Sequence, residues 1–161
     1  MSFRWQITAG RNGIMALRLK RKRQGALFQA PSDARAKRLR ERAETELRDY
    51  FAGRRRSFAS RCDIDRLPPF TQAVLRLTAK IPYGQVRSYQ WLARQLGKPK
   101  AARAVGSALG RNPIPIIIPC HRIVRRDGAI GNFSLGSGWK KRLLNLEKSF
   151  VKTKTSFDLS G

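Results

Sequence analysis

An isoleucine-rich run broken by prolines, from Asn112 to His121, constrains the fold of this chain more than any other segment. It reads Asn-Pro-Ile-Pro-Ile-Ile-Ile-Pro-Cys-His. Proline has no backbone N–H to donate to a β-ladder, so the run is not a central strand. Its apolar side chains favour burial. We therefore predict a short, buried, extended segment that holds Cys120 in place.

Cys120 and His121 are candidate catalytic residues. His121 is the only histidine among 161 residues, and it lies directly beside a thiol that it can activate. Neighbours on an extended chain point to opposite sides, so we expect His121 to reach Cys120 through a water molecule. These residues alone do not decide between catalysis and two structural alternatives. Cys120 could be an inert buried thiol, and His121 could be a histidine of the core.

The charge of the chain favours a polyanionic partner. Lys and Arg number 35 against 10 Asp and Glu, which gives a net charge of +25. Residues 1–66 hold 18 basic and 7 acidic side chains, and residues 67–161 hold 17 and 3. The excess therefore lies on both halves of the chain. Nucleic acid is the predicted partner, and a merely well-solvated surface is the alternative.

The same composition argues against membrane and metal-binding classes. No apolar run reaches the roughly 20 residues of a membrane span, and residues 1–13 lack the apolar core of a secretory signal. The two cysteines, Cys62 and Cys120, do not have zinc-ligand spacing and suit a reducing compartment. We expect a cytoplasmic protein (prokaryotic cytosol or nucleoid), with no metal site and no membrane association.

Residues 1–66 predict a small α/β domain followed by a connector. Apolar and basic residues alternate over 15–20, as in a half-buried strand, and we expect a hairpin partner at 26–29. Ser32 and Asp33 supply N-cap chemistry for an amphipathic helix that Gly53 ends.

Residues 67–148 predict a mostly helical domain, which makes the fold class α+β, and residues 149–161 form a polar tail. Ser88 is expected to cap one helix, and Pro99 to open another over residues 100–109. Together these two helices form a helix-turn-helix pattern. The second is rich in Ala and Gly, which suits either close approach to a nucleic-acid groove or tight helix packing.

Few acids are present to orient His121. Beyond residue 66 there are only Asp127, Glu147 and Asp158. Asp127 precedes a glycine, as turn residues do, and Asp158 lies in the predicted tail. Glu147 follows the apolar positions of the helix predicted over 139–147. It is therefore the expected orienter of the imidazole.

A set of collinear motifs covers about half of the chain. They read Ile-Pro-Tyr-Gly at 81–84, Ser-Tyr at 88–89, Ala-Ala-Arg-Ala-Val-Gly at 101–106, Asn-Pro at 112–113, Pro-Cys-His-Arg at 119–122, Gly-Asn-Phe-Ser at 131–134, and Leu-Leu ahead of Glu147. The set resembles the O6-alkylguanine-DNA alkyltransferases, also called methylated-DNA–protein-cysteine methyltransferases.

The resemblance implies a catalytic role for five residues. Cys120 would accept the alkyl group from guanine O6, irreversibly and once per molecule. His121 would take the thiol proton through a water, and Glu147 would orient the imidazolium. Tyr89 would donate to guanine N3 as the base leaves. Asn112 would hold the turn between the DNA-binding helix and the active-site segment. No cofactor is implied.

The resemblance also implies a DNA complex in which the target base is flipped out of the duplex. The second helix of the pattern would enter the minor groove, with Arg103 in place of the extruded nucleotide. The implied partner is double-stranded DNA containing O6-alkylguanine, bound by a monomer; cooperativity on DNA and use of O4-alkylthymine stay open. The expected DNA contacts are Ser88, Tyr89, Arg94, Lys98, Lys100, Ala102, Arg103, Gly106 and Arg111. The expected base-binding residues are Ile123, Phe133, Ser134 and Leu135, with the carbonyl of Cys120.

Two features depart from the family pattern. The N-terminal α/β domain is abbreviated relative to that of the family. Ser134 is usually followed by two glycines, and here Leu135-Gly136 takes their place. We expect Leu135 to narrow the pocket mouth against bulky alkyl groups.

Two other functions compete with alkyl transfer. An alkyltransferase-like protein would sense lesions without transfer, although such proteins typically lack the cysteine. A thiol hydrolase would turn over repeatedly.

Overall fold

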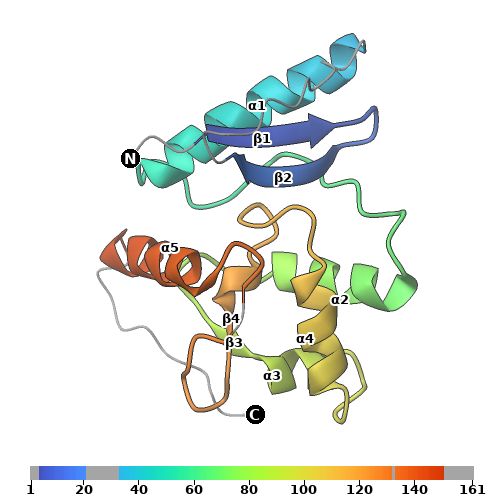
Figure 1. Ribbon diagram of the computed structural model, residues 1–161, viewed down its shortest axis with the longest axis vertical. Coiled ribbons are helices and arrows are strands. Elements are labelled where there is room, and N and C mark those ends of the chain that lie inside the picture. The colour runs from blue at the N-terminus through green and yellow to red at the C-terminus, as the bar shows by residue number, and fades with distance from the viewer. Residues whose placement is uncertain (1–3, 21–32, 132, 151–161) are drawn as a thin grey trace. The chain divides into compact units, whose positions relative to one another are not determined.

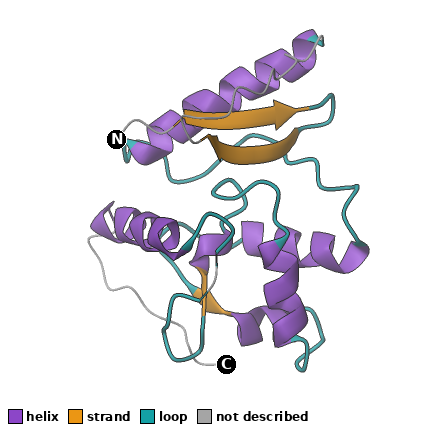
Figure 2. Ribbon diagram, in the orientation of Figure 1, coloured by secondary structure: helices purple, strands orange, loops and turns teal. Residues whose placement is uncertain are grey.

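In a computed structural model, the structure describes residues 4–20, 33–131 and 133–150 (Figure 1). The chain divides into two compact units, Met1–Arg66 and Leu67–Gly161. Helices and short strands occur in both units, so the predicted α+β class is confirmed (Figure 2). Among the described residues, no helix combines the length and the hydropathy that crossing a bilayer requires.

The first unit pairs a two-stranded sheet with one helix. Strands β1 (Arg4–Ala9) and β2 (Ile14–Lys20) are antiparallel, with Ile7 opposite Leu17. Helix α1 (Ala34–Phe51) packs on the sheet. Alternate strand residues face the helix, and Ile7 and Leu17 are among those that are buried. This small apolar layer is the core of the unit.

The strand predicted over residues 15–20 is confirmed as β2, but β1 was not foreseen. Its buried residues are Ile7 and Ala9, too few to mark a strand in the sequence. The partner predicted at 26–29 and the cap residue Ser32 lie outside the described residues. Asp33 caps α1 as predicted, because its Oδ1 accepts from the backbone N–H of Arg35 at 2.8 Å.

A buried carboxylate ties the segment after α1 back to the helix. Glu46 is 2% exposed and accepts hydrogen bonds from the backbone N–H groups of Ala59 at 3.2 Å and Ser60 at 3.1 Å. The guanidinium groups of Arg42 and Arg55 lie 3.4 and 3.5 Å from the same carboxylate. The charge is therefore buried with partners, as a buried carboxylate requires.

The second unit is built from helices around one short parallel strand pair. Its helices are α2 (Pro69–Ala79), α3 (Tyr89–Gln95), α4 (Ala102–Gly110), the 3-10 helix η1 (Cys120–Arg122) and α5 (Ser137–Phe150). Strands β3 (Arg87–Ser88) and β4 (Ile123–Val124) bring the segments before α3 and after η1 together. Ser88 caps α3 as predicted, because its Oγ accepts from the backbone N–H of Trp91 at 2.9 Å.

Helix α4 begins later than the sequence predicts. We expected it to start at Lys100 with Pro99 in its first turn, but the first helical residue is Ala102. Pro99 instead lies in a turn that the backbone N–H of Ala101 closes onto the carbonyl of Lys98 at 2.8 Å. The fixed φ of proline suits the second position of such a turn as well as it suits a helix start.

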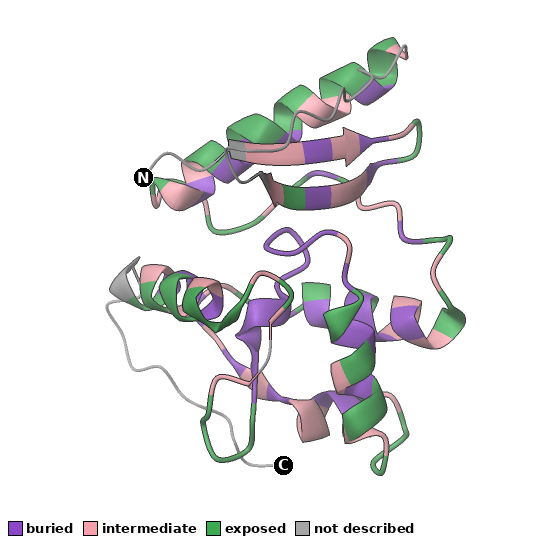
Figure 3. Cartoon of the chain, viewed as in Figure 1, coloured by how far each residue is buried: buried purple, intermediate pink, exposed green. Residues whose placement is uncertain are grey.

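The isoleucine-rich segment is buried, as predicted, but it is not extended. Ile114 to Cys120 are all buried (Figure 3). Ile116 has a φ of +76°, and the backbone N–H of Ile118 donates to the carbonyl of Ile114 at 3.0 Å. The segment therefore folds back on itself. An extended backbone for Cys120 and His121 is also wrong, since both lie in η1.

We expect Gly13→Ala to destabilise the first unit. A Cβ on Gly13 would lie 2.6 Å from the backbone oxygen of Arg61, where strand β2 joins the connector. Overpacking of this kind costs roughly 1–3 kcal/mol, which urea unfolding can measure. Gly10→Ala is the control, because its Cβ would meet the flexible Met15 side chain. An equal loss of unfolding free energy in the two variants would contradict the prediction.

Candidate active site

Cys120 lines a pocket of about 650 Å³ in the second unit. The thiol residue is 5% exposed. The pocket is lined by Tyr89, Gln90, Ala102, Arg103, Gly106, Leu109, Gly110, Cys120, Arg125, Arg126, Gly131, Phe133 and Ser134. This volume lies within the range of pockets that bind small molecules.

Asn112 joins α4 to the segment that carries Cys120. Its Oδ1 accepts from the backbone N–H of Ile114 at 3.0 Å. Its Nδ2 donates to the carbonyl of Ile118 and to Cys120 Sγ, both at 3.1 Å. One buried amide thus holds both ends of the folded-back segment and contacts the thiol directly. This is the location that the sequence predicts for Asn112.

His121 contacts the residue that was expected to orient it. His121 Nε2 lies 2.8 Å from Glu147 Oε1, and both residues are buried. An ionised carboxylate only accepts hydrogen bonds, so Nε2 carries the proton and Nδ1 is the basic nitrogen. Burial lowers the pKa of His121, against the opposing effect of Glu147. The resting imidazole is therefore neutral.

Arg122 is a member of this cluster that was not foreseen. Its Nε and Nη2 donate to Glu147 at 2.8–3.1 Å, and its Nη1 donates to the carbonyl of Ile81 at 2.6 Å. The backbone N–H of Gly84 donates to Glu147 Oε2 at 2.9 Å. Burial opposes ionisation of Glu147, but the hydrogen bonds from His121 and Arg122 and the positive charge of Arg122 lower its pKa to about 2.

Lys140 is a second buried cation that was not foreseen. It is 0% exposed, and its Nζ donates to the carbonyl of Ile123 at 2.5 Å. Nζ also lies 5.8 Å from the centroid of the Tyr89 ring. Burial lowers the pKa of Lys140 to about 8. In the sequence it is one of 35 basic residues, and nothing there marks it as buried.

The thiol of Cys120 is protonated in the resting protein. Burial raises its pKa to about 11, while the hydrogen bond from Asn112 and the charge of Lys140 act in the opposite direction. A thiol is a poor nucleophile until its proton is removed. Reaction at this sulfur therefore needs a base, and His121 is the neighbouring residue that can serve.

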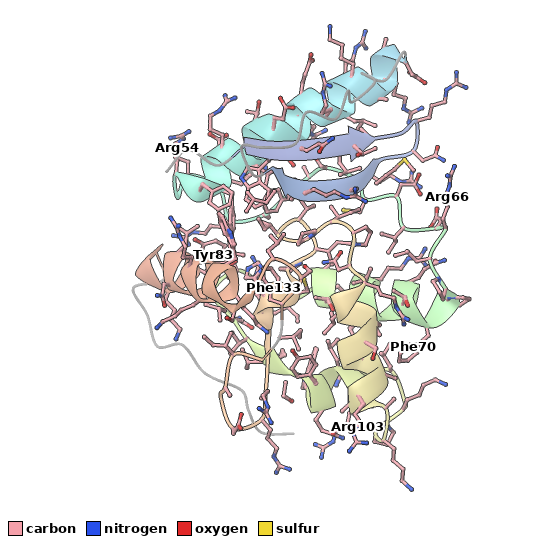
Figure 4. The ribbon with its side chains drawn as sticks, in the orientation of Figure 1. Arg54, Arg66, Phe70, Tyr83, Arg103 and Phe133 are labelled. Atoms are coloured by element: carbon pink, nitrogen blue, oxygen red, sulfur yellow. The ribbon has the colours of Figure 1, made fainter. Side chains whose placement is uncertain are left out.

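Helices α3 and α4 form one wall of the pocket. Tyr89 lies at the start of α3, and Ala102, Arg103 and Gly106 lie on α4. A Cβ on Gly106 would lie 3.7 Å from the Tyr89 ring, in ordinary contact. Arg103 is exposed at the beginning of α4 (Figure 4). Ala102 and Gly106 therefore line the pocket, whereas Val105 is buried in the core.

Several residues predicted for the site do not line the pocket. Ser88 is buried and caps α3, and the carbonyl of Ile123 accepts from Lys140. Leu135 is half-buried and lies outside the lining, so its effect on alkyl-group size stays a prediction. Four basic residues predicted to contact DNA are exposed and do not belong to the lining: Arg94, Lys98, Lys100 and Arg111.

Residues 69–149 match the family model described as the DNA-binding domain of 6-O-methylguanine DNA methyltransferase. That is half of the chain, and it contains every residue of the pocket. The chain belongs to this family. The resemblance inferred from the sequence motifs is therefore confirmed.

Members of this family that are similar to the chain come from bacteria and archaea. The chain is 46% identical over 107 residues to the methylated-DNA–protein-cysteine methyltransferase of Mycobacterium tuberculosis, covering 66% of this chain and 64% of the relative. It is 41% identical over 114 residues to the constitutive enzyme of Bacillus subtilis, covering 70% and 68%. The structure of Mycobacterium tuberculosis OGT in complex with DNA aligns with a TM-score of 0.76 and 37% identity, covering 91% of this chain and 87% of that one.

We expect Glu147→Gln to destabilise the protein in a pH-dependent way. Removing one partner of a buried charge cluster costs roughly 3–5 kcal/mol, because Arg122 is left unpaired. The folded pKa of Glu147 is about 2 against an ordinary value of 4.5. Its stabilisation is therefore complete above pH 4.5 and lost as the pH falls towards 2. The difference between the two proteins in urea unfolding should narrow over that range.

The control is Glu44→Gln, which removes an equal charge from a side chain that is 47% exposed. A large effect in this control, or a Glu147→Gln difference that does not depend on pH, would contradict the assignment.

Proposed function

We propose that this protein repairs DNA by transferring an alkyl group, methyl above all, from guanine O6 to Cys120. The observation that carries the proposal is a buried thiol that lines a pocket of about 650 Å³, next in the chain to a histidine that is paired with Glu147. The enzymes that it resembles are named for this reaction. The matched segment spans about 64% of the Mycobacterium tuberculosis enzyme, so the activity is tested directly below.

In the proposed reaction, Cys120 Sγ attacks the alkyl carbon, the S–C bond forms and the C–O6 bond breaks. The thiol proton passes through a water to Nδ1 of His121, and Glu147 stabilises the resulting imidazolium. The electron pair of the broken bond goes to the guanine, where Tyr89 donates a proton or hydrogen bond at N3. The products are guanine and an S-alkylcysteine. The thioether is stable, so each molecule acts once and needs no cofactor.

The substrate base enters the pocket from a DNA duplex, and the helix-turn-helix of α3 and α4 is the proposed DNA-binding element. A base inside the stack cannot bring its O6 to a thiol that is 5% exposed, so the nucleotide must be flipped out. Ala102 and Gly106 let α4 approach a groove closely, and Arg103 would fill the space that the base leaves. The chromosomal DNA of its bacterial and archaeal relatives lies in the cytoplasm, where we propose that the protein works.

Intact-mass analysis tests the transfer. After incubation with duplex DNA that contains O6-methylguanine, the protein should gain one methyl group on Cys120. Cys120→Ser should gain none. Cys62→Ser is the matched control and should react normally, because Cys62 lies in the other unit and burial raises its pKa to about 12. Binding without a mass gain would indicate a lesion sensor, and repeated turnover would indicate a hydrolase.

We predict that Leu135 limits the size of the transferred group. Leu135 follows Ser134, which lines the pocket, and takes the place of a residue without a side chain. Leu135→Gly should raise the rate of benzyl transfer relative to methyl transfer by about tenfold, a range typical of steric discrimination in apolar sites. Rapid-quench rates with O6-methylguanine and O6-benzylguanine measure it. An unchanged ratio would exclude this role.

A further inference from the structure

The turn after β4 holds two arginines at the rim of the pocket. Arg125 and Arg126 both line the pocket and are both exposed. The backbone of the turn is well defined, because the N–H of Gly128 donates to the carbonyl of Arg125 at 3.0 Å and the N–H of Arg125 donates to the carbonyl of Ala129 at 2.9 Å. The two cations are therefore presented on an ordered support.

No acidic side chain in the described part of this unit neutralises these cations. The acids in residues 67–131 and 133–150 are Asp127 and Glu147. Asp127 accepts from the backbone N–H of Ala129 at 3.0 Å, and Glu147 is buried with His121 and Arg122. Neither guanidinium of Arg125 or Arg126 forms a hydrogen bond or ion pair with any described residue. Their charge is available to an anion from outside the chain.

Arg125 and Arg126 line the pocket from the turn after β4, and Arg103 lines it from the beginning of α4. In the view of Figures 1 and 4, the turn after β4 and Arg103 lie on opposite sides of α3. A ligand in the pocket therefore meets cations from two separate segments of the chain. The base of a nucleotide is uncharged, but its phosphates are anionic and remain outside when the base is inserted.

We propose that Arg125 and Arg126 bind the DNA phosphates that flank the flipped nucleotide. The inference rests on the proposed function and adds a second DNA-binding element to the helices α3 and α4. Guanidinium groups pair well with phosphate oxygens, in charge-assisted bonds that hold the backbone without reading sequence. Such contacts suit a protein that must bind lesions in any sequence.

Arg125 also lies near Tyr89, and the experiment must separate the two effects. A Cβ on Gly131 would lie 3.5 Å from Arg125 Cγ and 3.0 Å from Tyr89 Oη, so both side chains border the same glycine. Burial raises the pKa of Tyr89, and the charge of Arg125 acts in the opposite direction. An arginine that served Tyr89 alone would affect the free base as much as DNA.

The test compares two substrates, a duplex with one O6-methylguanine and the free base O6-methylguanine, which has no phosphate. Arg125→Ala/Arg126→Ala should lower the rate of methyl transfer from the duplex by about 10- to 100-fold at 0.15 M salt. It should also reduce the slope of log affinity against log salt by about 1.4–1.8, the value for two lost phosphate contacts. Transfer from the free base should change less than about twofold, since neither group contacts the reacting atoms.

Two variants serve as controls. Lys80→Ala/Lys141→Ala removes two exposed charges from the same unit outside the pocket and should retain the rate on DNA. Arg125→Lys/Arg126→Lys keeps both positive charges and should recover most of the rate of methyl transfer from DNA. The proposal is overturned if Arg125→Ala/Arg126→Ala loses no more rate on DNA than Lys80→Ala/Lys141→Ala does. It is also overturned if Arg125→Ala/Arg126→Ala loses as much rate on the free base as on DNA. A wild-type protein that transfers methyl from neither substrate refutes the proposed function itself.

Discussion

The carboxylate of Glu147 organises the second unit. It accepts hydrogen bonds from His121, from Arg122 and from the backbone of Gly84, so α5, η1 and the segment before β3 meet at one buried group. An ionised carboxylate is costly to bury unless its partners satisfy it. This carboxylate has such partners, and the same bonds keep the imidazole oriented with Nδ1 as its base. The stability of the unit and the proposed proton transfer therefore depend on one interaction.

The environment of Cys120 shows how a buried thiol can be protected at rest and still serve the proposed transfer. Burial keeps its pKa near 11, so the resting sulfur is protonated and resists unspecific alkylation. Asn112 and Lys140 act in the opposite direction and stabilise the thiolate once a base removes the proton. Asn112 contacts the sulfur from the segment after α4, and Lys140 lies on α5, which packs on η1. The fold itself therefore offsets part of the cost of burying a thiolate.

The first unit uses a similar device for a structural purpose. The buried Glu46 carboxylate pairs with the guanidinium groups of Arg42 and Arg55 and accepts from two backbone N–H groups of the following segment. A chain with only 10 acids among 161 residues thus places two of them, Glu46 and Glu147, where they are almost fully buried. The remaining basic side chains are left largely uncompensated, and that excess suits binding to a phosphate backbone.

The sequence alone was enough to identify the motifs around Cys120, the caps Asp33 and Ser88, and Glu147 as the partner of His121. Each of these depends on local patterns or on the scarcity of a residue type. Only the tertiary structure revealed strand β1, the folded-back course of the isoleucine-rich segment, and the later start of α4. It also revealed Arg122 and Lys140 as buried cations and Arg125 and Arg126 as the pocket rim. Basic residues look alike in a chain that holds 35 of them, and packing alone separates the buried ones from those that face the pocket or solvent.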